Sequence, residues 1–269
     1  MKLRKFKKAV KRHSLLYKSR FKLLGKNSYA EAITVFDYNS FNTKDSIPLY
    51  FQTINKEIFA NGKPREELEV IVKLCTWLRQ HIKGGRGLSE PSEDALKLML
   101  AGKGGVCSDM VQIFNNFCVI NDIRVREWGI TSIPFDKTYG GHSFNEVYIK
   151  AVNKWVMVDA SKCLFFYTAK QPLPLSTLEL FKLLRQDIAV HSQTFYETEH
   201  SSEKSIQKNY LHPKASPFLV CNYRNAIYDR FLKRLKPYFP VFVIHFIIYL
   251  IGKSYHYRFP LDDYKKLFA

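Results

Sequence analysis

The residues best suited to covalent chemistry are a cysteine, a histidine and an aspartate that follow one another along the chain. Cys107 comes directly after "AGKGGV" and opens a segment, 107–117, whose apolar residues have the spacing of one helix face. A thiol in the first turn of a helix lies at the positive end of the helix dipole, which lowers its pKa and favours the nucleophilic thiolate. We therefore predict that Cys107 is a nucleophile. A buried structural cysteine beside a loop is the alternative.

A thiolate nucleophile needs a base within hydrogen-bond reach and a third group that orients this base. His142 follows two glycines at the start of a strand, and Asp159 ends the next strand, "KWVMVDAS". In a hairpin that turns at Asn153, the two lie eleven and six residues from the turn, so we expect a bulge or register shift to bring them level. A surface histidine at a strand end and an aspartate in a turn or helix cap are the alternative interpretations.

Hydrophobic periodicity predicts the elements that position these residues. Further helices are predicted at 65–82, at 89–102 with Ser92 as a cap, and at 176–188. Strands are predicted at 123–130, 143–151 and 154–161. Two earlier runs, 32–38 and 47–54, also have the composition of strands.

The strings "GGVCSDMVQIFNNFCVINDIRVREWGI" and "GGHSFNEVYIKAVNKWVMVDAS" resemble the transglutaminase-like cysteine enzymes, and the resemblance covers roughly residues 65–185. In that family a cysteine follows glycine at the start of a helix. A "GIPAR" strand comes next, and then a "GHxWxEV" strand and a "W(x)xxD" strand. Position by position, Cys107 matches the nucleophile, His142 the general base and Asp159 the orienting acid.

The chain departs from the family pattern at a few positions. "NDIRVR" stands for "GIPAR", with Asn121 and Val125 as the departures, and Ser143 and Phe144 replace the usual Ala or Ser and Trp. The last change bears on the substrate channel but removes no catalytic atom. The resemblance implies an α+β, papain/transglutaminase-like fold. In that fold the helix bearing the cysteine packs on an antiparallel sheet, here followed by a helical C-terminal extension.

The resemblance also implies an activity: acyl transfer on amide bonds of a protein or peptide-like substrate, as in an amidase, a protease or a transglutaminase. A thioester would form and be resolved by water or an amine, through oxyanions stabilised by backbone N–H groups. The N–H of Cys107 is one expected donor, and the Trp77 indole is a second candidate unless that ring is part of the core. The alternative function is a non-catalytic transglutaminase-like adaptor that binds a partner protein or an anionic membrane surface.

We expect no cofactor and no metal. Cys107, His142, Asp159 and Cys163 are zinc-ligand types, but no pair has the short spacing of a structural zinc site. The five cysteines form no CxxC pair, which is typical of free thiols in a reducing compartment. Because no apolar signal region follows the basic N-terminus, we expect a cytoplasmic protein, with peripheral membrane contact as a further expectation.

Charge divides the chain further. Among its 269 residues, 42 are Lys or Arg and 24 are Asp or Glu; residues 1–30 hold eleven of the basic ones and no acidic one, and residues 201–269 hold twelve basic against four acidic. Such a balance indicates an anionic membrane surface or a polyanion as partner, and no nucleic-acid motif accompanies it.

Three segments follow from these patterns: a basic amphipathic arm (1–30), a transglutaminase-like core (31–175) and a mainly helical basic extension (176–269). The arm is expected either to lie on an anionic membrane or to be a solvated helix that packs one side on its own domain. The most apolar run, 237–253, is too short to span a membrane. It is predicted to be a buried helix, with membrane-surface docking as the alternative.

Overall fold

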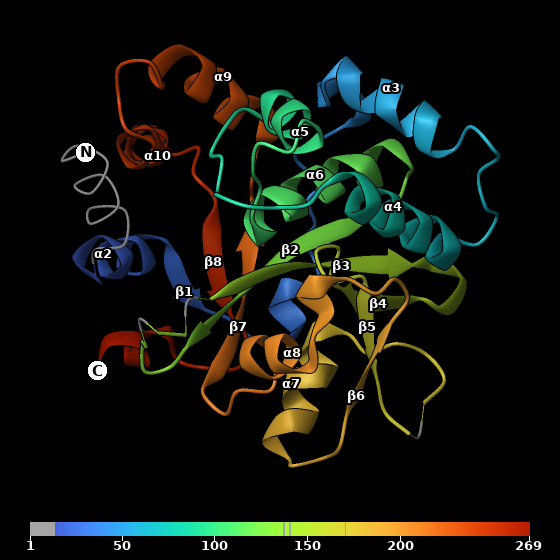
Figure 1. Cartoon of the computed structure of the whole chain (residues 1–269). Coiled ribbons are helices and arrows are strands. Elements are labelled where there is room, and N and C mark those ends of the chain that lie inside the picture. Colours follow the sequence, from blue (N-terminus) through green and yellow to red (C-terminus); the bar gives the residue numbers. More distant parts are fainter. Residues whose placement is uncertain (1–13, 137, 140, 170) are drawn as a thin grey trace.

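The computed structural model describes residues 14–136, 138–139, 141–169 and 171–269. The protein is α+β, and a six-stranded sheet lies at its centre (Figure 1). The strand order is β1-β8-β7-β2-β3-β4. The strands are β1 (Gly25–Asn27), β2 (Val125–Ser132), β3 (His142–Ile149), β4 (Lys154–Val158), β7 (Ala215–Cys221) and β8 (His256–Phe259).

The three strands predicted between residues 123 and 161 are confirmed as β2, β3 and β4, which pair antiparallel in sequence order. The sheet as a whole is mixed, because β1 pairs parallel with β8. The prediction of an antiparallel sheet therefore holds for β2, β3, β4, β7 and β8 but not for the β1 edge.

Four helices cover one face of the sheet (Figure 1). They are α3 (Leu49–Ile58), α4 (Glu67–His81), α5 (Ser92–Leu100) and α6 (Cys107–Ile120). The helices predicted around residues 65–82 and 89–102 are confirmed, but Ser92 is the first helical residue and not the cap, which is Pro91. The Ser92 hydroxyl instead donates to Asp229 Oδ2 at 2.5 Å.

The two early strand predictions are wrong. The run 47–54 lies mostly in α3, where Phe51, Ile54 and Ile58 are buried at the i, i+3, i+7 spacing of a helix face. The run 32–38 enters a short 3₁₀ helix, Glu31–Ile33, and then a loop. Short apolar runs are ambiguous between strand and helix, and here packing against α6 decides in favour of a helix for 47–54.

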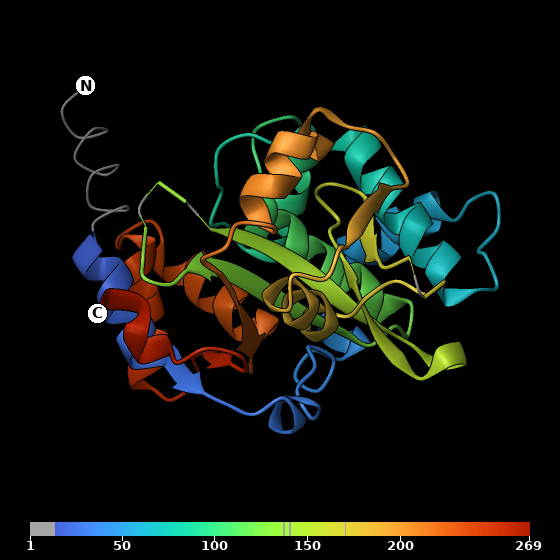
Figure 2. The same cartoon turned by 90° about the horizontal axis from the view of Figure 1, so that it is seen from below.

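The opposite face of the sheet is covered by α7 (Thr177–Arg185), α8 (Glu203–Asn209) and a two-stranded sheet of β5 (Leu164–Tyr167) and β6 (His191–Thr194) (Figure 2). The helix predicted at 176–188 is confirmed as α7, which Ser176 caps by accepting from the Glu179 N–H at 3.3 Å. Three further 3₁₀ turns connect elements, at Lys44–Ser46, Lys150–Val152 and Glu199–Ser201.

A third apolar cluster lies at the end of the sheet where β1 and β8 meet α2 (Ser14–Leu24), α9 (Asn225–Leu235), α10 (Val241–Leu250) and the 3₁₀ helix η5 (Tyr264–Phe268). Phe21 and Leu24 bury one side of α2 in this cluster. The described part of the predicted arm thus packs on the protein, whereas residues 1–13 lie outside the described residues.

The central sheet runs across both predicted segment boundaries. The strand β1 comes from the predicted arm, and β7 and β8 come from the predicted extension. The extension does contain α7 to α10, but its β7 pairs with β2 next to the predicted core. Among the residues that the structure describes, no helix has the length and apolar character needed to cross a bilayer.

Candidate active site

Two glycines set the path of the chain into α6. Gly104 and Gly105 have φ angles of +140° and +114°. A Cβ on Gly104 would lie 2.6 Å from the Arg86 carbonyl oxygen, and one on Gly105 would lie 2.7 Å from Met99 Cε. The Gly105 N–H donates to the Arg86 carbonyl at 2.8 Å. These close contacts hold Gly104 and Gly105 against Arg86 and Met99. The helix α6 then begins at Cys107, as predicted.

Asp109 links the start of α6 to the preceding segment that contains Leu88. Its Oδ2 accepts from the Val106 N–H at 3.0 Å and from the Leu88 N–H at 3.1 Å. The inner face of the helix is fully buried against the sheet, and the Asn145 amide of β3 donates to Asn115 Oδ1 at 2.8 Å. The helix is therefore held at its first turn and along its length, which leaves Cys107 little freedom to shift.

The β3–β4 hairpin brings His142 and Asp159 together without a bulge. Ile149 pairs with Lys154 and Asn145 with Val158, because the turn takes up residues 150–153. Continued by one step, this register sets Asp159 opposite Phe144, two residues from His142 on the same face. Diagonal neighbours of this kind lie within side-chain reach. The expected bulge or register shift is therefore not needed.

The imidazole and the carboxylate are in direct contact: His142 Nε2 lies 2.7 Å from Asp159 Oδ2. Asp159 is fully buried and has three other donors. Its Oδ1 accepts from the Ser161 and Lys162 N–H groups at 2.8 and 3.1 Å, and its Oδ2 accepts from the Tyr210 hydroxyl at 2.7 Å. The carboxylate is thus oriented from both sides and holds the imidazole in one position.

Cys107, His142 and Asp159 shift one another's pKa values. Burial acts to raise the pKa of the Cys107 thiol, but the charge of His142 and hydrogen bonds with its imidazole and with the Ser143 backbone outweigh burial and lower the pKa. For His142, burial acts to lower the pKa, but Asp159 and Cys107 raise it to about 9. Burial likewise acts to raise the pKa of Asp159, which His142, Lys162 and Tyr210 hold below its ordinary value. Both shifts favour a thiolate–imidazolium pair.

The other four cysteines have the opposite electrostatics. All are buried, whereas Cys107 is partly exposed. Burial raises the pKa of Cys75 and Cys118 well above the ordinary thiol value, and it raises the pKa of Cys163 and Cys221 to about 12. Thiolate character is therefore concentrated at Cys107.

Two residues of the site were missed by the sequence reasoning. Tyr210 follows α8, is fully buried, and meets the His142 ring edge-on at 5.5 Å besides its bond to Asp159. It lies in a polar stretch, "EKSIQKNYLHP", which gives no signal of burial. Glu146, the Glu of "GHxWxEV", could have been singled out from the resemblance.

Glu146 joins three elements beneath the site. Its Oε2 accepts from Arg126 Nε at 2.6 Å and from Trp128 Nε1 at 2.8 Å, both in β2, and its Oε1 accepts from the Thr177 N–H of α7 at 2.7 Å. Both Glu146 and Arg126 are buried. This ion pair fixes β3, the strand that begins with His142, to its neighbours.

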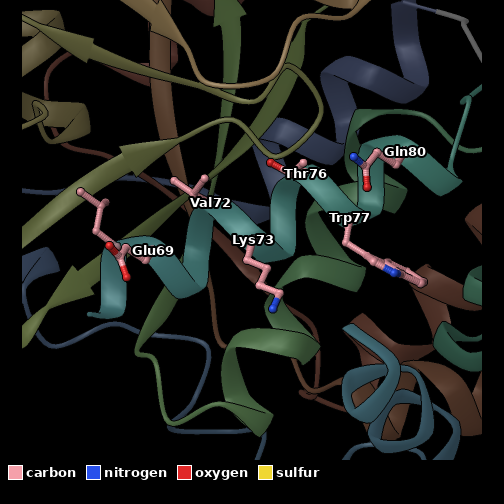
Figure 3. Close-up of a pocket in the computed structure, with 7 residues that line it drawn as sticks. Glu69, Val72, Lys73, Thr76, Trp77 and Gln80 are labelled. Carbon is pink, nitrogen blue, oxygen red and sulfur yellow. The ribbon is translucent and has the colours of Figure 1, made fainter. Parts of the chain in front are cut away.

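Trp77 lies in a different environment from the one expected of an oxyanion donor. Its ring stacks on His81 at 4.0 Å and lines a groove of about 470 Å³ along α4 (Figure 3). Trp77 and Lys73 project from the same side of the helix in this view. None of the three predicted site residues lines the groove. Among the described residues, no three His, Cys, Asp or Glu side chains gather as a metal site requires.

One comparison with known proteins covers the part of the chain that holds these residues. The sequence model of the transglutaminase-like superfamily matches residues 52–160, a segment that contains Cys107, His142 and Asp159. This segment is therefore similar to that superfamily. No curated protein matches the chain.

Among solved structures, the chain is similar to a candidate cysteine protease from Cytophaga hutchinsonii, with 19% sequence identity and a TM-score of 0.33. The match covers 45% of this chain and 38% of the length of that protein.

Proposed function

We propose that the protein catalyses acyl transfer on amide bonds, with Cys107 as nucleophile, His142 as general acid and base, and Asp159 as the group that orients His142. The contact between His142 Nε2 and Asp159 Oδ2, at 2.7 Å, carries the proposal, because it leaves Nδ1 as the ring nitrogen for the thiol at the start of α6. A lowered thiol pKa beside an imidazole whose pKa is raised is the electrostatic pattern that such chemistry needs.

In the first half-reaction the Cys107 thiolate attacks the amide carbonyl carbon, and the carbonyl oxygen becomes an oxyanion. The first N–H groups of a helix have no intrahelical acceptor, so the Cys107 N–H at the start of α6 is a ready donor to this oxygen. Collapse of the intermediate breaks the C–N bond while His142 gives its proton to the leaving amine. A thioester on Cys107 remains.

In the second half-reaction, neutral His142 takes a proton from water or an amine, which attacks the thioester carbonyl. The thiolate is expelled and returns to its ion pair with His142. Water gives hydrolysis and an amine gives a new amide bond. Hydrolysis and amide formation use the same residues of the protein. The acceptor molecule, water or an amine, therefore decides which of the two reactions takes place.

The proposal is tested by measuring whether the protein converts peptides in a mixture of known composition. A peptide mixture from a digested proteome is incubated with the protein, with and without hydroxylamine, and analysed by mass spectrometry. We expect cleaved or deamidated peptides without hydroxylamine and peptide hydroxamates with it, since hydroxylamine intercepts a thioester. Cys107→Ala abolishes both, whereas Cys221→Ala, a change at a buried cysteine remote in sequence, retains them. Products that persist in Cys107→Ala would contradict the proposal.

The alternative function, a non-catalytic adaptor, has its own outcome in this experiment. An adaptor gives no product with any peptide or acceptor, and its Cys107 shows no thiolate reactivity. Both results together would replace the enzyme by the adaptor.

A further inference from the structure

The helix α10 has an outer face on which large apolar side chains are exposed. Phe242, Phe246 and Leu250 follow one another at spacings of four residues, so they form one stripe along the helix, and Phe239 lies just before the helix begins. Each is between 45% and 66% exposed, and Tyr238 beside the stripe is 79% exposed. A contiguous apolar stripe on a surface, rimmed by polar residues, marks an interaction site.

The fold does not need this face. The inner side of α10 is held by Ile244 and Ile248, both fully buried against α9 and β8. His245 also meets the Tyr228 ring of α9 edge-on at 5.2 Å. Because the inner side alone anchors α10, the outer stripe is free to serve a binding function.

Positive charge surrounds the stripe. Residues 230–261 contain six Lys or Arg and no Asp or Glu. Arg230, Lys233 and Arg234 are exposed on α9, which packs beside α10, and Lys253 is exposed just after it. Two nearby acidic groups are already bonded: Glu90 pairs with Lys236, and Asp229 accepts from the Ser92 N–H and hydroxyl.

The N-terminal helix adds to this charge. The helix α2 packs in the same apolar cluster as α10, and the charge of Arg20 on α2 contributes to lowering the pKa of His245. Residues 1–13, which lie outside the described residues, carry seven Lys or Arg and join the chain at Ser14. The helix α2, which these residues precede in the sequence, lies at the same end of the molecule as α10 (Figure 1).

We propose that the outer face of α10, with the basic residues of α9, docks on an anionic lipid bilayer as an interfacial helix. An apolar stripe with cationic neighbours fits the boundary between acyl chains and anionic headgroups. A ten-residue helix is too short to cross the bilayer, so it lies along the surface. A second copy of this chain would bring like charges together, and a polyanion in water would leave the phenylalanines exposed.

The test is co-sedimentation of the full chain with vesicles of phosphatidylcholine alone and with one third phosphatidylglycerol, at low and high salt. We expect binding to the anionic vesicles that weakens with salt. Lys233→Gln/Arg234→Gln lowers the affinity about 25-fold, since each basic residue at the surface contributes about fivefold. Phe242→Ser/Phe246→Ser lowers it at least about tenfold.

A matched control is Val35→Ser/Leu49→Ser, which removes two other exposed apolar side chains, each 73% exposed. Leu49 begins α3, on the other side of the molecule from α10 (Figures 1 and 2). This control keeps full vesicle binding, and thermal unfolding shows that all variants are folded.

Three results would overturn the proposal. The first is equal binding to neutral and anionic vesicles, or none to either. The second is unchanged binding by the α10 variant. The third is a dimer in sedimentation velocity without lipid that Phe242→Ser/Phe246→Ser dissociates, which would make this face an interface between copies. None of these depends on the proposed acyl transfer, because no α10 or α9 residue is in the triad.

Discussion

At the scale of single residues, the site depends on how one buried carboxylate is satisfied. Asp159 has no access to water, so four protein donors must take the place of its hydration. Three of them are its own backbone neighbours and His142, which the hairpin supplies. The fourth, Tyr210, arrives from a segment far along the chain and donates to the same oxygen that His142 contacts.

Removal of the Tyr210 hydroxyl tests this arrangement. Tyr210→Phe leaves a charged acceptor with one donor fewer, so the free energy of unfolding at pH 7 should fall by about 1.5–3 kcal/mol. Tyr210 helps to hold the pKa of Asp159 below its unfolded value of about 3.9, so this stability is present above that pH. The difference from the wild type should therefore shrink as the pH falls through the lowered pKa of Asp159. Urea unfolding at several pH values measures it.

The control for this prediction is Tyr139→Phe. The Tyr139 hydroxyl donates to a neutral acceptor, the Asn209 carbonyl, at 2.7 Å. Its loss should cost about 0.5–1.5 kcal/mol with little dependence on pH. Equal pH profiles for the two variants would show that Tyr210 does not stabilise the ionised form of Asp159.

At the scale of elements, helix and strand types around the site followed from the sequence, but their contacts did not. Periodicity identified α4, α6, β2, β3 and β4 because the apolar residues of each recur at helix or strand spacing. It failed at 47–54, where a short apolar run fits either type. It also gave the wrong expectation for the hairpin, since the number of residues that a turn takes up depends on its conformation.

The Arg126–Glu146 pair is the element-scale contact with the largest predicted effect. Glu146→Gln leaves the Arg126 guanidinium buried without its counter-charge, so we expect the free energy of unfolding to fall by about 3–5 kcal/mol. Glu93→Gln, in the exposed pair with Lys97, is the matched change and should cost about 0.3–0.5 kcal/mol. Chemical denaturation compares them. Similar losses would mean that Glu146 does not hold β2, β3 and α7 together.

At the scale of the whole molecule, the sequence predicted the fold class and the contact between His142 and Asp159, but not which later strands complete the central sheet. The motifs with sequence signals lie between residues 65 and 185, whereas β7, β8 and Tyr210 come from later segments that carry no motif. Long-range strand pairing of this kind leaves no local pattern in a single sequence. A boundary at 175 would separate β2 from β7, with which it shares six residue pairs.

A fragment tests this point. Residues 31–175 alone lack β7, β8 and Tyr210, so an edge of β2 that is paired in the full chain would be exposed. We expect no cooperative thermal unfolding for this fragment, whereas the full chain should unfold cooperatively. Circular dichroism measures both. A fragment with a sharp transition and a reactive Cys107 would restore the predicted core as an independent domain.

The most direct measurement of the central claim is the rate at which iodoacetamide alkylates each cysteine as a function of pH, followed by mass spectrometry. We predict that Cys107 reacts first and that its rate rises with a midpoint below the ordinary thiol pKa of about 8.5. His142→Asn should move this midpoint upward, because the thiolate loses the imidazolium charge, while His191→Asn at an exposed strand leaves it unchanged. The claim would be contradicted if Cys75, Cys118, Cys163 or Cys221 reacted faster in the folded protein. It would also be contradicted if the Cys107 midpoint lay near 8.5 with and without His142.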